Sequence, residues 1–278
     1  MRYKNIIVLI TLLLININTF SQNSLCSIKS STQEYQLPFR SGEELDYVLR
    51  YSFTGINAEL AKVNFRFSKV QEEGKSYYLA AMSGSTLKLY DIFFRARESY
   101  QSKIDLSTFK PFYFFRDVTE GKYGVKNQIF FNKDRSIRAL VDVINGVKQD
   151  TTIKGNGCTF DVISILYYLR TLDYDSISNN QPYICNIAID GGIYSVSIKY
   201  AGREIKRVPG MGHYKTIKLV GSVIEGKVFT GKEQIIVWAS DDKNLIPLYF
   251  EMPLRVGKLG GRLESYKNIK NRLDSKIK

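Results

Sequence analysis

Residues 45–68 of the chain read LDYVLRYSFTGINAELAKVNFRFS, and this stretch decides the fold. Apolar side chains recur at every second position, first at Leu45, Tyr47, Leu49, Tyr51 and Phe53 and then at Ala61, Val63, Phe65 and Phe67. Because successive side chains of a strand point to opposite faces, each half predicts a strand with one buried face. Residues 54–57 between the halves, Thr-Gly-Ile-Asn, suit a hairpin turn.

The same two-residue period continues through most of the chain. We expect further strands at 77–82, 96–104, 111–118, 123–131, 137–144, 147–153, 183–189, 194–200, 204–208, 214–220, 233–239, 245–254 and 261–267. Turn signals separate several of them, at Glu120-Gly121-Lys122, Asn145-Gly146 and Asp190-Gly191-Gly192. About fourteen strands predict a mainly β, antiparallel fold, either barrel-like or built from two curved stacked sheets.

One segment follows a helical period instead. Between residues 160 and 172, apolar side chains at Val162, Ile165, Leu166 and Leu169 lie on one face of a helix. Thr159 can cap its start, Asp161 suits the positive first turn and Arg170 suits the negative end. We therefore predict one central amphipathic helix at about 160–172. It is expected to cover a sheet, although such a helix can also bind a membrane.

The first 21 residues, MRYKNIIVLITLLLININTFS, have the pattern of a secretory signal peptide. Arg2 and Lys4 precede an apolar run, and Thr19-Phe20-Ser21 gives a small-x-small ending, which predicts cleavage before Gln22. A membrane-spanning helix is the alternative. It requires about 20 apolar residues, and Asn16 and Asn18 interrupt the run. We expect export to the periplasm of a Gram-negative cell envelope.

The remaining chain divides into three parts by composition. Residues 22–40 are rich in Ser, Gln and Asn without a period, and they predict a flexible N-terminal linker. Residues 41–267 form the predicted β-rich core, and residues 268–278 a basic tail or frayed helix.

Three cysteines follow the signal segment: Cys26, Cys158 and Cys185. Export would place them where disulfides form. Cys158 precedes the predicted helix and Cys185 lies in the strand after it, so this pair can form, or both can be buried free thiols. Leu25 before Cys26 does not fit a lipoprotein anchor, which leaves Cys26 disordered, reactive or paired between chains.

The chain is basic, with 40 Lys and Arg against 27 Asp and Glu and a net charge of +13. Loss of residues 1–21 removes two basic and no acidic residues, which lowers the charge to +11. An exported protein rarely meets nucleic acid, so we expect none as a partner. The basic residues concentrate between residues 255 and 278, where they form either a solvated face or a peripheral contact with an anionic surface.

Few residues carry an obvious chemistry. His213 is the only histidine and lies in a glycine-rich loop, and the motifs for nucleotide, metal and serine-hydrolase sites are absent. The acidic pairs Glu43-Glu44, Glu72-Glu73 and Asp241-Asp242 are adjacent in sequence, and strand neighbours point to opposite faces. Trp238, the only tryptophan, follows Ile235-Ile236-Val237 and is interpreted as core, with ligand stacking as the alternative. We assign no catalytic, cofactor-binding or metal-binding residue.

The order of several short segments resembles a known family. They are Gly42-Glu43-Glu44-Leu45-Asp46-Tyr47, Glu120-Gly121-Lys122-Tyr123, the helical segment 161–170, Trp238-Ala239-Ser240-Asp241-Asp242 before a strand with Pro247, and Gly257-Lys258-Leu259. The order of these segments resembles that in the bacterial domain-of-unknown-function family numbered 3108, and the resemblance covers about residues 41–267. The resemblance implies an exported protein, and it implies no catalytic residues.

These observations predict an exported, non-enzymatic envelope protein that binds an apolar or amphipathic ligand, either lipid or glycan. Long alternating strands, many Tyr and Phe residues and a covering helix suit such a role, and binding alone requires no motif. Two alternatives remain. One is a structural or protein-interaction module of the envelope. The other is a glycan or lipid hydrolase, which would require two acidic side chains, or His213 and an acid, to converge in a cleft.

Overall fold

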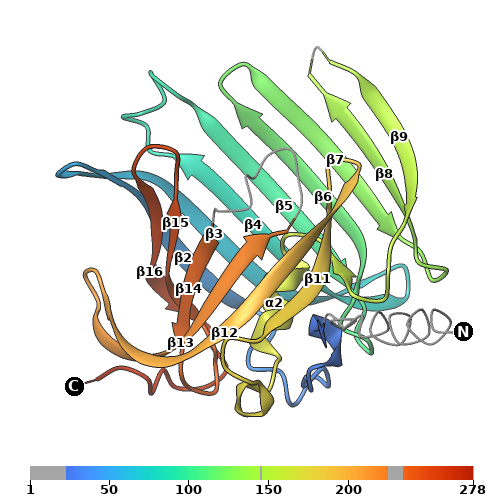
Figure 1. Cartoon of the computed structure of the whole chain (residues 1–278). Helices are drawn as coiled ribbons and strands as arrows, with labels where there is room; N and C mark the ends of the chain where they lie inside the picture. The colour runs from blue at the N-terminus through green and yellow to red at the C-terminus, as the bar shows by residue number, and fades with distance from the viewer. Residues whose placement is uncertain (1–22, 145, 225–233, 278) are drawn as a thin grey trace, which may run out of the picture.

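A computed structural model describes residues 23–144, 146–224 and 234–277, and Figure 1 shows one large sheet that curls around a short helix. The predicted signal segment lies outside the described residues. The strands are β1 (Asn23–Ser24), β2 (Glu43–Phe53), β3 (Ile56–Glu72), β4 (Lys75–Thr86), β5 (Ala96–Ile104), β6 (Pro111–Glu120), β7 (Tyr123–Phe131), β8 (Ser136–Val143), β9 (Lys148–Lys154), β10 (Thr159–Phe160), β11 (Pro182–Ile189), β12 (Gly192–Val208), β13 (Gly212–Val223), β14 (Gln234–Ser240), β15 (Pro247–Pro253) and β16 (Lys258–Lys267). The helical elements are α2 (Ser164–Arg170) and the short 3₁₀ turns η1 (Leu25–Ser27) and η2 (Tyr174–Ser176).

All 16 strands belong to one sheet, in the order β1-β11-β12-β13-β14-β15-β16-β2-β3-β4-β5-β6-β7-β8-β9, with β10 beside β11. The pairing of β16 with β2 joins the two halves of the sequence. β1 and β10 run parallel to β11, and the pairs along the rest of the order are antiparallel. The mainly β, barrel-like prediction is therefore confirmed. In the described part of the chain the curl is not closed, because β9 and β1 end the order at opposite edges.

The hairpin turns follow the sequence signals closely. Phe53 pairs with Ile56 and Glu120 pairs with Tyr123, which leaves two-residue turns at Thr54-Gly55 and Gly121-Lys122. Thr54 and Gly55 both have positive φ, as tight hairpin turns require. The β11–β12 turn has the same form, with Asp190-Gly191 between Ile189 and Gly192. Asn145 and the first residue of the strand predicted at 233–239 lie outside the described residues.

The two strands predicted at 194–200 and 204–208 are one strand, β12. Tyr200 pairs with Leu219 and Arg203 with Ile217, so β12 advances by three residues where β13 advances by two. The extra residue is a bulge at Ala201-Gly202, and it exchanges the faces of the residues beyond it. A two-residue period cannot continue through such a bulge, which is why the sequence predicts a break. β1 and β10 are too short to show any period.

The central helix is shorter than predicted. α2 spans Ser164–Arg170, whereas Thr159 and Phe160 form β10. The Asp161 carboxylate accepts hydrogen bonds from the backbone N–H groups of Ile163 and Ser164, both at 2.8 Å. Asp161 therefore satisfies the start of the helix, and the predicted cap at Thr159 is wrong because that residue is already in the sheet. None of the helices in the described ranges has the length and apolarity needed to cross a membrane.

The helix lies inside the curl, where aromatic side chains form the main core. Tyr167 of α2 packs against Phe39 and Phe67, with ring centroids 5.2 and 5.0 Å apart. The largest fully buried side chains of this core include Phe39, Phe67, Phe109, Phe114 and Phe160. A second apolar cluster, around Tyr47, Ile246 and Leu263, fills the region where β16 meets β2.

The segment predicted as a flexible linker, residues 22–40, packs into the core instead. Leu25, Leu37 and Phe39 are at most 2% exposed, and the Phe39 ring meets Phe67 edge-on at 4.6 Å. The polar composition of the segment hides these three anchors, because they are separated by irregular spacings that match no strand or helix period. The described part of 22–40 is thus a structural strap across the core.

Residues 268–277, predicted as a basic tail or frayed helix, also pack against the rest of the protein. Ile269 and Leu273 contact the second apolar cluster, and Ser275 is buried. The Lys270 ammonium group donates hydrogen bonds to the carbonyl oxygens of Tyr35 and Leu37, both at 2.8 Å. The C-terminal segment therefore holds the N-terminal strap in place, and one of its basic side chains is used inside the protein.

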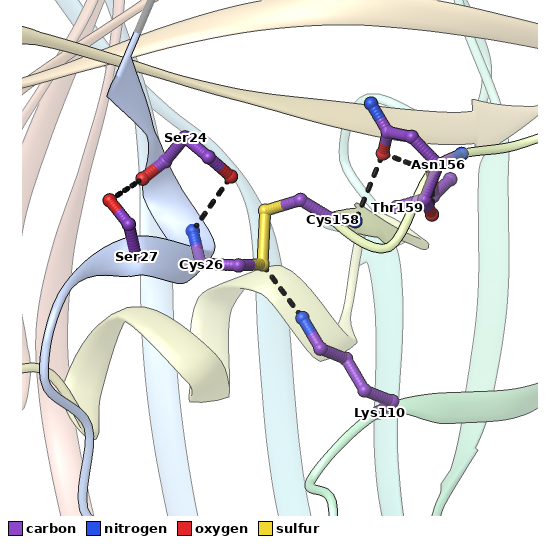
Figure 2. Close-up of a disulfide and its surroundings, with 7 residues drawn as sticks. All are labelled: Ser24, Cys26, Ser27, Lys110, Asn156, Cys158 and Thr159. Atoms are coloured by element: carbon purple, nitrogen blue, oxygen red, sulfur yellow. Dashed lines mark hydrogen bonds between the residues drawn. A yellow bond between two sulfur atoms is a disulfide. The ribbon is translucent and has the colours of Figure 1, made fainter.

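Figure 2 shows that the disulfide joins Cys26 to Cys158. The pairing considered for Cys158 and Cys185 is wrong. β1 and β10 both pair in parallel with β11, one after the other along it, which brings Cys26, just after β1, to Cys158, just before β10. Cys185 is a buried free thiol, and burial raises its pKa to about 12. Cys185 therefore stays protonated and unreactive near neutral pH.

Lys110 lies beside the disulfide in apolar surroundings. Its ammonium nitrogen is 2.8 Å from the Cys26 sulfur, 4.0 Å from the centre of the Phe160 ring and 4.7 Å from that of Tyr168. No acidic side chain in the described part of the chain forms a salt bridge with it. Burial lowers the pKa of Lys110 to about 8.

Replacing both cysteines of the disulfide by Ala should lower the free energy of unfolding by about 2–5 kcal/mol. The bond closes a loop of 132 residues, so its loss increases the entropy of the unfolded chain. Urea unfolding measures the change. The Cys185→Ala variant is the control and should lose roughly 1 kcal/mol. A double variant no less stable than this control would contradict a structural role for the disulfide.

Lys110 should make the protein more stable as the pH rises from about 7 to about 9.5. Above its lowered pKa the folded protein releases the Lys110 proton, whereas the unfolded chain keeps it up to its ordinary pKa of 10.5, so fewer protons are bound in the folded state. The free energy of unfolding of the unaltered protein should rise by up to roughly 2 kcal/mol over this range, relative to that of Lys110→Met. Urea unfolding at each pH gives both values. A difference independent of pH would show that Lys110 is ordinarily solvated.

Candidate functional site

A cavity of about 490 Å³ lies between α2 and the inner face of β11 to β15. Its wall is almost entirely apolar and includes Val162, Ile165, Leu166 and Leu169 from the helical segment, Ile187, Ile189, Tyr194, Val196 and Ile198 from β11 and β12, and Leu219, Ile235, Val237, Leu245, Pro247 and Met252 from the remaining strands and loops. Tyr167 on the same helix points instead into the aromatic core. The helix therefore separates the filled core from the cavity.

The cavity exists because small residues face it from the sheet. Gly221 of β13 lies two residues beyond Leu219, on the same face. A Cβ atom at Gly221 would approach only the carbonyl oxygen of Ile235, at 3.9 Å. The volume of a side chain is therefore missing at this point of the inner face.

Apolar side chains also border the opening of the cavity. Leu166 of α2 is 38% exposed and Ile235 of β14 is 42% exposed, although both line the wall. The apolar face of the helix is wider than the surface that the core covers. Exposure of apolar side chains to water costs free energy, so Leu166 and Ile235 indicate where an apolar ligand would enter the cavity.

Asp190 brings a charged side chain to the cavity wall. Asp190 forms a salt bridge with Arg116 of β6 at 3.1 Å, and its backbone N–H donates to the side chain of Asn127 at 3.1 Å. These bonds dock the β11–β12 turn onto β6 and β7. They connect the two arms of the curled sheet and leave the Asp190 carboxylate 42% exposed. Ser222 of β13 is also part of the cavity wall.

A buried ion pair fixes the end of α2 next to the cavity. Arg170 donates to both carboxylate oxygens of Glu43, at 2.6 and 2.9 Å, and to the carbonyl oxygen of Asn244 at 3.0 and 3.2 Å. The two side chains are 5% and 0% exposed. The guanidinium also lies 4.7 Å from the centre of the Phe39 ring. Arg170 is part of the cavity wall, but its charge is fully occupied by Glu43.

A larger hollow of about 840 Å³ lies along β2 to β6, and it differs in character. It is a shallow groove in which Asp46 accepts hydrogen bonds from Asn64 at 2.5 Å and from Ser265 at 2.6 Å. These bonds hold the pKa of Asp46 below its ordinary value, against the effect of burial. The groove is shallow, and Lys62 pairs with Glu264 across it at 2.9 Å, so it is a weaker candidate than the apolar cavity.

The acidic pairs singled out in the sequence do not converge. Glu43 binds Arg170, Glu72 binds Tyr77 and Lys103, and Asp241 binds Arg203. Asp242 accepts hydrogen bonds from Ser240 and Asn244, within a turn as its residue type indicates. His213 is exposed at the start of β13, and no group of three potential metal ligands occurs among the described residues.

Trp238 is buried at 4% exposure, in agreement with its interpretation as core. Its indole N–H donates to Glu204 at 2.5 Å, and the Lys206 ammonium lies 3.5 Å from the centre of its ring. The apolar run 235–238 is typical of a strand buried on both faces, but Ile235 is 42% exposed at the cavity wall, so β14 is not buried in this way. The sequence feature that could have indicated the cavity is the number of apolar residues in 162–169 and 235–237, which is larger than a single buried face of a helix or strand needs.

The fold and cavity define a class of β protein in which a single curled sheet surrounds a helix with an apolar pocket beside it. A family model described as "Protein of unknown function (DUF3108)" matches residues 46–264, and the chain belongs to this family. No curated protein matches the chain. Its fold is similar to that of the beta-barrel-like protein of domain of unknown function DUF1849 from Brucella abortus, with a TM-score of 0.56 and 11% identity over 83% of this chain and 99% of the other.

Replacing Glu43 by Gln should lower the free energy of unfolding by about 3–5 kcal/mol, because Arg170 would remain buried without its counter-charge. The matched control is Asp150→Asn in the exposed Arg138–Asp150 pair, where both side chains are about half exposed and the loss should be under about 1 kcal/mol. Urea unfolding measures both. In addition, the double variant Glu43→Leu/Arg170→Met should be more stable than Glu43→Gln. Equal losses in the buried and exposed pairs would contradict this account of the helix anchor.

Proposed function

We propose that this protein binds an apolar or amphipathic molecule in the cavity beside α2, with a lipid acyl chain as the best-matched occupant. The observation that carries the proposal is the apolar wall around about 490 Å³ of space. Ligand pockets for small molecules commonly have volumes of about 300–1,000 Å³ and mostly apolar walls. An apolar cavity of this size holds water poorly and binds apolar molecules well.

The distribution of polar groups favours an amphipathic ligand over a glycan. A glycan requires many hydrogen-bonding groups along its length, and few residues of the cavity wall carry polar side chains, namely Arg170, Tyr174, Asp190, Tyr194 and Ser222. A lipid requires an apolar channel for its chain and polar surroundings for its head. Asp190 at the exposed side of the opening supplies such surroundings.

We further propose that the protein acts in the periplasm of a Gram-negative cell, as a binding protein rather than an enzyme. The signal-peptide pattern of residues 1–21 supports export. The Cys26–Cys158 disulfide is typical of proteins that fold in an oxidising compartment.

The ligand proposal predicts saturable binding of cis-parinaric acid, a fluorescent long-chain fatty acid, and its loss in Gly221→Phe. The backbone at Gly221 is compatible with any L residue, so the new ring would fill the cavity without strain. We expect the affinity to fall at least about tenfold. Fluorescence titration measures it, and native mass spectrometry of the purified protein should show a bound lipid that Gly221→Phe lacks.

The control is Val220→Phe, which places the same ring one residue away on the opposite face of β13. It should bind the probe as the unaltered protein does. Equal weakening in both variants, or no binding by the unaltered protein, would contradict the cavity as a ligand site. Export is tested separately, by expressing the full chain and sequencing the N-terminus of the periplasmic protein. A protein that retains residues 1–21 in the cytoplasm would contradict export alone.

A further inference from the structure

The loop between β4 and β5 displays large apolar side chains to solvent. Leu89 is 70% exposed, Ile92 84%, Phe93 85% and Phe94 53%. These are among the most exposed apolar side chains of the described chain, and they occur within six residues of sequence. Such a concentration on a soluble surface marks a contact with another protein or with a membrane.

This loop has a defined structure that holds these side chains outward. The backbone N–H of Tyr90 donates to Leu87, and that of Phe94 donates to Tyr90, both at 2.8 Å. Asp91 accepts hydrogen bonds from Arg97 and from Thr86, which fix the loop to the ends of β4 and β5. The hydrogen bonds from Arg97 lower the pKa of Asp91 to about 2, so this anchor stays charged at physiological pH. The loop is therefore built to present apolar groups.

Neighbouring turns carry further apolar side chains at the same end of the strands, where Figure 1 shows the loops in a row. The Gly121 N–H donates to the carbonyl of Arg95, and the Ile144 N–H donates to that of Gly124, both at 2.8 Å. These bonds place the β6–β7 turn beside the loop and the β8–β9 connection beside that turn. Tyr123, Ile144 and Val147 are 48%, 52% and 68% exposed. We call residues 88–95, 121–123, 144 and 147 the apolar rim.

Positive charge accompanies the apolar rim. Lys88, Arg95 and Lys122 are exposed, and none forms a salt bridge with an acidic side chain in the ranges that the structure covers. The basic residues near the C-terminus are used differently. Arg262 pairs with Glu59, and Lys270 binds backbone carbonyls. The rim thus combines unpaired cations with exposed aromatic and aliphatic groups.

We propose that the apolar rim docks onto an anionic lipid bilayer, with Ile92 and Phe93 inserted at the interface and the three cations on lipid phosphates. Exposed aromatic residues favour the membrane interface, and each Lys or Arg near an anionic surface adds attraction. A second copy of the chain fits less well, because the rim carries the same unpaired positive charge on both copies. The proposal is independent of the cavity ligand.

Co-sedimentation with vesicles of phosphatidylethanolamine and phosphatidylglycerol tests the docking. The chain from Gln22 onward is used, because it contains all described residues and lacks the apolar N-terminal segment that would itself bind lipid. The unaltered protein should bind these vesicles, and Ile92→Ser/Phe93→Ser should bind at least about tenfold more weakly. Ile205→Ser removes a side chain that is 64% exposed elsewhere, and it should leave binding unchanged.

The charge component has its own variants. Lys88→Gln/Arg95→Gln should weaken binding roughly tenfold or more and reduce its sensitivity to salt. The matched control is Lys133→Gln/Arg135→Gln in the β7–β8 loop, which follows the opposite end of β7. This control should bind as the unaltered protein does.

Insertion itself is measured with Phe93→Trp. Its fluorescence should shift to shorter wavelength with vesicles and be quenched by brominated lipid, whereas Ile205→Trp should show neither effect. The native Trp238 is buried and contributes a constant background. Equal binding by the rim and control variants, or no blue shift in Phe93→Trp, would overturn the proposal. So would sedimentation equilibrium showing a dimer that Ile92→Ser/Phe93→Ser dissociates, since the rim would then be occupied by a second copy.

Discussion

The ion pair between Glu43 and Arg170 determines where the helix lies inside the curled sheet. Glu43 begins β2 and Arg170 ends α2, so the pair joins the strand at the seam of the two sheet halves to the only central helix described. Two charges buried without water are stable only with close and complete partners, and the carbonyl of Asn244 supplies the remaining acceptor. A shift of either side chain away from its partner would therefore cost free energy. It holds Tyr167 against the aromatic core and leaves the opposite side of the helix facing β12 and β13.

The cavity follows from this placement and from the way the curl closes. The sheet does not close by pairing its edge strands, and the β11–β12 turn reaches β6 and β7 through Asp190 and its partners. Polar contacts at this turn hold β11 and β12 to β6 and β7 without bringing the inner faces into full contact. With Gly221 on one wall and Leu166 on the other, the remaining space is larger than the side chains can fill. A core normally packs as densely as an organic crystal, so an apolar space of this size is a specific feature of the fold.

Much of the fold could be predicted from sequence, because burial on one face of a strand leaves a direct two-residue record. Leu45 and Tyr47 are buried as predicted, whereas Phe53 at the end of the same period is exposed, since the strand extends beyond the interior. What could not be predicted depends on contacts distant in sequence. The partner of Cys158 is set by a parallel pairing of two residues, and the burial of Phe39 is set by Phe67 and Tyr167. The cavity was visible only as an excess of apolar residues around Leu166 and Ile235, because sequence shows which side chains avoid water and not whether they fill the space.

The two apolar surfaces that remain differ in shape, and shape decides what can cover each of them. The cavity is concave and walled on several sides, so a flexible chain can lose most of its contact with water there. The apolar rim is a row of projecting loops, and a projecting side chain buries little area against a rigid flat protein. A lipid interface is soft and accommodates such a projection, and it offers phosphates to Lys88 and Arg95 at the same depth. The Asp91–Arg97 anchor prevents the loop from folding Ile92 and Phe93 back onto the sheet. Ile92 and Phe93 can therefore leave water only by contact with another molecule.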